Sequence, residues 1–289
     1  MNETHTATTD VYALVTSRII EQLEHDVVPW QKPWTNAGLP QNLLTHRPYR
    51  GINVWLLASL DYQINYFLTW KQLRSIGGSV QKGEKAHLVV FWKTPEQKEQ
   101  ATDEEKPKPV LRYYWVFNIE QCSGVPEHLI FPMTKPSQPL EVCETIIQKM
   151  PRRPDIRHKQ PEAFYRPEED YINMPKLKTF VNSESYYATL FHELIHSTGH
   201  TSRLDRKELS QMAEFGSELY SIKELTAEIG SCFLSSHAGI ENTFTNSVSY
   251  INGWLQKLRN DKRFIVYGST QAQKAVDFIL NIGKTEEYT

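Results

Sequence analysis

The sequence predicts an α+β protein built from two domains. Residues 10–118 mix short amphipathic helices with two strands rich in Val, Tyr, Trp and Phe. Residues 140–280 are dominated by segments with the apolar period of helices. Between them, residues 124–139 are rich in proline and carry no apolar period, which is typical of a boundary. We therefore expect one domain over residues 10–130. We expect a second, mainly helical domain with a small antiparallel sheet over residues 136–289.

The first domain is predicted to contain three helices and two long strands. Asp10 and Thr69 are typical N-cap residues, and Gly77 with Gly78 ends the helix that Thr69 begins. The charged, proline-containing segment between the strands is predicted to be a loop outside the core. The predicted helices are 11–23, 54–60 and 71–76, and the predicted strands are 87–93 and 110–118.

The second domain is predicted to hold five helices and two strands. Asn182 and Ser183 can cap a helix that ends near Gly199. Residues 163–165 and 170–174 are predicted to be strands joined by a turn, and we expect the second to form the sheet edge where an extended peptide could pair. The other predicted helices are 140–150, 221–238, 248–258 and 271–280.

Composition narrows the class of protein. The chain has 289 residues, enough for two ordinary domains, and a net charge of −2, which favours no class of partner. Its three cysteines are scattered without metal or disulfide spacing, which favours a reducing compartment. The polar first residues lack a signal-peptide pattern, and no stretch approaches the roughly 20 apolar residues of a membrane span. We expect a soluble, cytoplasmic protein with no membrane partner.

The most chemically specific stretch is an H-E-x-x-H pattern that begins at His192 and ends at His196. Residues four apart share a helix face, so His192 and His196 present two imidazoles to one ion. Two neutral imidazoles suit Zn²⁺, and another divalent metal such as Mn²⁺ is the alternative. Glu193 is the adjacent residue and can act as a general base toward water. The pattern predicts a zinc metallopeptidase in which Glu193 is catalytic.

Three residues compete for the position of third metal ligand. Glu224 and Glu228 lie four apart on the next predicted helix and share a face. The layout resembles that of glu-zincins, which implies that Glu224 is the ligand and that Glu228 hydrogen-bonds a ligand histidine; the reverse assignment stays open. His200 is the third alternative. Gly199 matches the glycine of the metzincin motif, but Ser202 stands where metzincins have their third histidine, so a substrate contact or a capping role suits His200 better.

The local charge of the first domain differs from that of the whole chain. Between Trp30 and Thr94, eight basic residues stand against two acidic ones, and tryptophans and tyrosines are interleaved with them. Basic side chains that follow phosphates and aromatic faces that stack on bases are features of single-strand binding. The alternative is a small α+β domain whose aromatic side chains fill its core.

Short stretches along nearly the whole chain resemble those of a single protein family. In the first domain they are residues 29–34, 47–53, 68–72, 77–78, 82–85, 116–118 and Gln121. In the second they are residues 192–200, 203–206 and 224–228, and Trp254 with the closing helix. With these stretches the chain resembles the ArdC-type antirestriction proteins of conjugative plasmids and phages. The resemblance implies an N-terminal single-stranded-DNA-binding domain, a C-terminal zincin-like metallopeptidase domain and protection of incoming DNA from host restriction.

The resemblance and the basic, aromatic composition together define the expected partners. These are single-stranded DNA and a protein substrate that the sequence does not identify. Three alternatives remain: a DNA-coating protein whose metal site is structural, a metalloprotease whose first domain recognises protein, and a metal-dependent nuclease. The candidate DNA-binding residues are Trp30, Lys32, Trp34, Arg47, Tyr49, Arg50, Asn53, Trp70, Lys71, Lys82 and Lys85.

Overall fold

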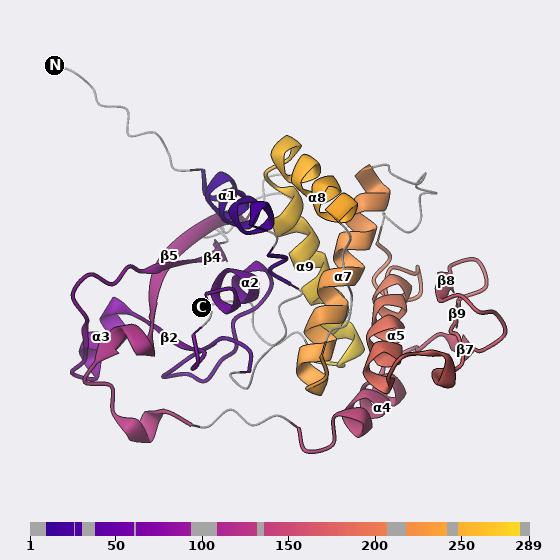
Figure 1. Ribbon diagram of the computed structural model, residues 1–289, viewed down its shortest axis with the longest axis horizontal. Helices are drawn as coiled ribbons and strands as arrows, with labels where there is room; N and C mark the ends of the chain where they lie inside the picture. The colour runs from indigo at the N-terminus through magenta and orange to yellow at the C-terminus, as the bar shows by residue number, and fades with distance from the viewer. Residues whose placement is uncertain are drawn as a thin grey trace, which may run out of the picture.

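The structure is a computed structural model, and the residues that it describes are 10–25, 27–30, 38–60, 62–93, 109–131, 136–206, 218–241 and 248–283. The predicted α+β class is confirmed. Figure 1 shows a β-containing N-terminal half beside a C-terminal half that consists mostly of helices. The predicted loop between the two long strands falls almost entirely outside the described residues. None of the described helices has the length and apolar character needed to cross a bilayer.

A four-stranded sheet forms the centre of the N-terminal half. Its order is β1-β2-β5-β4, with β1 parallel to β2 and the other neighbours antiparallel. The two long strands pair from His87 opposite Val116 to Lys93 opposite Val110, which is the whole length of the first of them. The strands are β1 (Gln41–Asn42), β2 (Tyr66–Thr69), β4 (His87–Lys93) and β5 (Val110–Asn118), and a separate pair joins β3 (Ser79–Val80) to β6 (Cys122–Ser123).

The N-terminal half has three described helices, and two of them begin at the N-cap residues that the sequence predicts. The Asp10 carboxylate accepts hydrogen bonds from two backbone N–H groups of α1 (Val11–Glu24). Thr69 and Gln72 form a reciprocal capping box at the start of α3 (Trp70–Ser75). The remaining helix, α2 (Ile52–Ala58), lies along the outer edge of β4, because the Asn53 amide exchanges two 2.7 Å hydrogen bonds with the backbone of Val90.

The C-terminal half contains five described helices and one small sheet. These helices are α4 (Pro139–Lys149), α5 (Ser183–Ser197), α7 (Glu218–Ala238), α8 (Val248–Asn260) and α9 (Phe264–Ile279). The strands are β7 (Asp155–Arg157), β8 (Phe164–Arg166) and β9 (Tyr171–Asn173). Short 3₁₀ turns lie at Ile119–Gln121, Glu127–Leu129 and Leu177–Thr179.

The small sheet differs from the expected antiparallel one in two respects. Its order is β7-β9-β8, and β7 runs parallel to β9, so the sheet is mixed. The strand β9 is therefore central, and the prediction that it forms the edge was wrong; the free edges belong to β7 and β8. The cause is β7, which has a single apolar residue, Ile156, and so gives almost no strand signal in the sequence.

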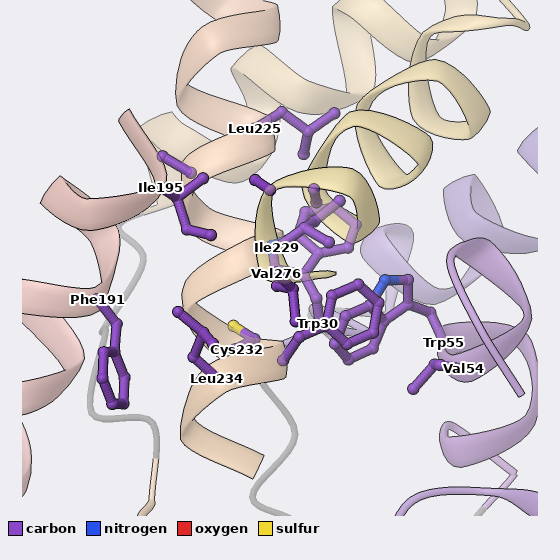
Figure 2. Packing of buried hydrophobic residues seen from close by; sticks show 14 of the residues in the cluster. Trp30, Val54, Trp55, Phe191, Ile195, Leu225, Ile229, Cys232, Leu234 and Val276 are labelled. Atoms are coloured by element: carbon purple, nitrogen blue, oxygen red, sulfur yellow. The ribbon is translucent and has the colours of Figure 1, made fainter. Parts of the chain in front are cut away.

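The main hydrophobic core draws side chains from both halves. Figure 2 shows Trp30 and Trp55 from the N-terminal half packed against Ile229 and Cys232 of α7 and Val276 of α9. The helix α1 also packs on α8 and α9, and the Thr16 hydroxyl donates a 2.7 Å hydrogen bond to the Lys262 carbonyl oxygen. The division at residues 131–135 stays a prediction, since one core spans it.

Candidate metal centre and nucleic-acid surface

The helix α5 carries the H-E-x-x-H residues because its other faces are buried. The Asn182 side chain accepts a 2.8 Å hydrogen bond from the Ser185 backbone N–H and fixes the start of the helix, as expected. Phe191, Leu194 and Ile195 have no exposed surface and hold the helix in the core. This packing turns the polar side chains of the motif toward α7.

Three metal-binding side chains converge between α5 and α7. The Nε2 atoms of His192 and His196 are 3.0 Å apart, and each lies 3.5 Å from a carboxylate oxygen of Glu224. Ligands at zinc distances around one tetrahedral ion are separated by about 3.3 Å. Within the described part of the chain, these three residues are the group of histidine, cysteine and acidic side chains whose spacing suits one ion. The donor atoms therefore fit a single divalent metal.

Close packing between α5 and α7 sets this convergence. A Cβ atom on Gly230 would lie only 2.6 Å from Cδ1 and 2.8 Å from Cγ1 of Ile195, so the glycine allows the helices to approach. The Ser231 hydroxyl donates a 3.0 Å hydrogen bond to the carbonyl oxygen of Ala188 on α5. These contacts fix the register that brings Glu224 opposite the two histidines.

Burial and the contacts among these side chains together set the protonation of the site. Burial raises the pKa of the Glu193 carboxyl, against the opposing effects of His192 and of the Tyr165 backbone N–H. It also lowers the pKa of His196 to about 4, so this imidazole is neutral near pH 7, the form that binds a metal. Burial would raise the pKa of Glu224, but its interactions with the two histidines outweigh that effect and lower it.

The other two candidates for the third ligand are not part of this group. Glu228 is nearly fully buried on α7 but is not one of the three converging residues. Nδ1 of His200 lies 2.8 Å from the Ser202 hydroxyl and accepts a 3.2 Å hydrogen bond from the Ser202 backbone N–H. His200 thus closes the turn after α5.

An arginine that the sequence reasoning did not single out for the site holds the end of α5. The almost fully buried Arg203 donates hydrogen bonds to the carbonyl oxygens of Ser197 (2.7 Å) and Arg152 (2.8 Å). It also donates to the Tyr165 hydroxyl and to the Asp170 carboxylate, at the two ends of the β8–β9 turn. Arg203 therefore joins the metal helix to the small sheet. In the sequence, Arg203 belongs to the stretch 203–206 that contributes to the family resemblance, but the resemblance assigned no role to it.

The structure places several predicted DNA-binding residues where they contact protein. Trp30 has no exposed surface, Arg50 pairs with Asp277 of α9, and Asn53 bonds the backbone of β4. Trp30 therefore has no free face for a base. Its composition-based assignment could not foresee this, because composition does not reveal which face of an element a side chain occupies. Arg50 and Asn53 are partly exposed, and their contacts with DNA stay predictions. Lys32 and Trp34 lie outside the described residues. Tyr49 is half-buried, and the candidates that remain exposed are Arg47, Trp70, Lys71, Lys82 and Lys85.

Each half of the chain matches the model of a known protein family. Residues 9–117 match the family model for the N-terminal domain of anti-restriction factor ArdC, and residues 141–271 match that for a zincin-like metallopeptidase. The crystal structure of metal-free antirestriction ArdC protein from the R388 plasmid is 39% identical, with a TM-score of 0.76 over 94% of this chain and 97% of that chain. The chain belongs to the ArdC family of antirestriction proteins.

Other relatives extend the ArdC comparison. The Mn(II)-bound structure of the R388 protein is 38% identical, with a TM-score of 0.77 over 96% of this chain and all of that one. The uncharacterized protein y4eC of Sinorhizobium fredii is 34% identical over 94% of this chain and 92% of its own length. A DNA primase TraC of Escherichia coli is 36% identical over 92% of this chain, which spans only 26% of that protein.

Proposed function

We propose that this chain is an antirestriction protein that binds single-stranded DNA and hydrolyses peptide bonds at a divalent-metal site. The observation that carries the enzymatic part is the convergence of His192, His196 and Glu224, with the buried Glu193 beside the first histidine. The ion is Zn²⁺, which suits two imidazoles and a carboxylate, with Mn²⁺ as the alternative that the Mn(II)-bound relative supports.

The residues around the site have distinct roles in peptide hydrolysis. When bound, the ion supplies Lewis-acid polarisation of water and of the substrate carbonyl. Glu193 accepts the proton of the attacking water and delivers it to the leaving amine, as a general base and then an acid. Glu228, one turn beyond Glu224, is a positioning residue for a ligand histidine.

The edge strand β8 supplies a place for the substrate backbone. β8 packs against α5, and its Tyr165 backbone N–H acts on the Glu193 carboxylate. An extended peptide that added to the free edge of β8 would pass beside Glu193. This assigns the edge role to β8 in place of β9.

The N-terminal half supplies the DNA-binding part of the proposal. Its match to the ArdC N-terminal domain and its exposed basic residues, Arg47, Lys71, Lys82 and Lys85, support binding to phosphates. We expect wild-type protein to retard labelled single-stranded DNA in a gel, and the affinity to fall steeply as salt rises. Binding that does not respond to salt would contradict this part.

The Glu193→Gln variant tests the enzymatic part. We expect it to retain one metal ion per chain by elemental analysis, because Glu193 is not a ligand, and to lose cleavage of a fluorogenic casein substrate. Casein cleavage at the wild-type rate by this variant would rule out Glu193 as the general base.

The same variant separates proteolysis from DNA coating as the means of protection. Transfer of a plasmid into a restricting host would be measured with wild-type protein and with Glu193→Gln. If proteolysis protects the DNA, the variant gives the transfer frequency of a strain without the protein. If it protects as well as wild type does, coating of the DNA is sufficient and the metal site serves another purpose.

A further inference from the structure

One face of the large sheet carries a row of aromatic side chains near solvent. Tyr113, Trp115 and Phe117 alternate along β5 and so share a face, since strand side chains alternate sides. The rings of Tyr113 and Trp115 are 5.8 Å apart, and Phe117 lies 6.3 Å from Trp70 at the start of α3. Trp70 is 53% exposed and Trp115 is 45% exposed. We call these four residues the aromatic strip.

The strip lies in a gap between two helices that cover the same face. At one end α1 covers β5, and its Tyr12 contacts Trp92 at 6.4 Å. At the other end α3 covers the sheet by placing Leu73 with Leu68 in a small core cluster. Figure 1 shows β5 running between α1 and α3. Large aromatic side chains left partly exposed in such a gap are typical of a binding surface.

The charges around the strip suit a polyanion. Arg74 lies one helical turn beyond Trp70 on α3, hence on the same side of the helix, and both Arg74 and Lys71 are exposed. Among the described residues 38–93 and 109–123, the acidic side chains are Glu84 and Glu120. Glu84 accepts a hydrogen bond from the Gln121 side chain, and Glu120 accepts one from the Ile64 backbone N–H. The charged side chains of α3, beside the rings of Trp70 and Phe117, are therefore both positive.

We infer that the aromatic strip is the base-stacking platform of the protein, with Lys71 and Arg74 holding the phosphates of the same strand. This rests on the proposed binding of single-stranded DNA and names the surface that performs it. Stacking of bases on aromatic faces tolerates any sequence, because every base has a flat face. The platform therefore binds single strands without sequence preference, and duplex DNA, whose bases are already stacked, binds only through its phosphates.

The test measures dissociation constants for a fluorescein-labelled dT₂₀ strand by anisotropy. Loss of one stacking ring weakens binding by about 5- to 150-fold, so we expect Trp115→Ala and Trp70→Ala to fall in that range. Trp115→Phe keeps a flat ring and should retain most of the affinity, whereas Trp115→Leu keeps only apolar character and should bind as poorly as Trp115→Ala. Equal binding by the Leu and Phe variants overturns base stacking by Trp115.

A matched control lies on the opposite face of the same strand. Tyr114 is 36% exposed and alternates away from Trp115, so Tyr114→Ala should leave the dissociation constant unchanged. Weakening as large as that of Trp115→Ala would show that the platform is on the wrong face. Lys71→Ala should lower the slope of log affinity against log salt by about one, since it removes one phosphate contact. Circular dichroism would establish that each variant is folded.

The outcomes distinguish a failure of the aromatic strip from a failure of the proposed binding of single-stranded DNA. If wild-type protein does not bind dT₂₀, the DNA-binding function itself fails. If wild type binds and both tryptophan-to-alanine variants bind equally well, only the aromatic strip is overturned.

Discussion

The indole of Trp55 on α2 stacks on the ring of Phe233 on α7, with ring centroids 4.6 Å apart and planes inclined by 24°. The two residues come from opposite halves of the chain, and Trp55 has no exposed surface. The helix that Phe233 belongs to also carries Glu224. The N-terminal half thus packs on the helix that carries the third candidate metal ligand.

Replacing Trp55 by alanine should destabilise the whole protein. Removal of a fully buried tryptophan costs about 3–5 kcal/mol in free energy of unfolding. Because the core is shared, we expect tryptophan fluorescence and far-ultraviolet circular dichroism to shift together in urea, as one transition. Trp70→Ala is the control: its side chain is exposed, and the change should stay within about 0.5 kcal/mol. Two separate transitions, only one of them shifted, would contradict a common core.

Gly230→Ala should weaken metal binding without touching a ligand. The added Cβ meets the Ile195 side chain at distances that real Cβ atoms do not adopt. Because Ile195 is fully buried, we expect α7 to shift from α5 and to carry Glu224 from the histidines. Gly253 on α8 has nothing within 4 Å of the corresponding position, so Gly253→Ala leaves binding intact and adds up to about 1 kcal/mol of helix stability. Titration with Zn²⁺ by calorimetry would compare them, and equal affinities would show that helix spacing does not matter.

Replacing Glu224 and Glu228 separately by alanine should show which of them is the metal ligand and which one supports a ligand histidine. Glu224→Ala removes a donor and should leave less than one metal ion per chain after dialysis, measured by elemental analysis. Glu228→Ala should keep near one ion per chain, with affinity lowered by about 10- to 100-fold if it orients a histidine. The reverse result would assign the third ligand to Glu228, and retention of metal by both variants would rule out the carboxylate as an essential ligand.

The ion pair between Asp170 and Arg203 should make stability depend on pH. Burial raises the pKa of Asp170, but the Arg203 and Tyr165 hydrogen bonds prevail and hold it below its ordinary value of 3.8. A group with a lowered folded-state pKa adds stability above its unfolded pKa and loses it as pH falls through the folded one. Wild-type stability should therefore fall from about pH 5 downward, and the decline should be smaller in Asp170→Asn.

The control for that prediction is a similar pair at the surface. Asp155 pairs with Arg157 on β7, where its side chain is mostly exposed to solvent. Urea unfolding of Asp155→Asn should give the same profile against pH as wild type, because screened pairs contribute little. An unchanged acid profile for Asp170→Asn would mean that Arg203 does not depend on this carboxylate.

The periodic elements could be predicted from the sequence because burial and local signals agree there. The strands at 87–93 and 110–118 have the predicted bounds, and α7 begins only three residues before the predicted start. The caps at Asp10, Thr69 and Asn182 are also confirmed. Each of these elements combines an apolar period with a cap or a run of β-branched and aromatic residues.

What the sequence could not reveal was the orientation of elements relative to one another. Glu224 and Glu228 share a helix face, and only the crossing of α5 and α7, set by Gly230 against Ile195, brings Glu224 to the histidines. Trp30 and Trp115 are equally aromatic in the sequence, yet one fills the core and the other is exposed. The alternation of side chains along residues 110–118 does predict that Trp115 and Phe117 share a face of the strand. The argument from composition did not use this alternation.

The packing of α1 on α8 and α9 limits how the family can be rearranged by recombination. A break in the chain at any point between these helices would separate α1 from its partners and leave the shared core open. The chain's length within TraC, about a quarter of that protein, is consistent with a module that joins larger proteins as one piece.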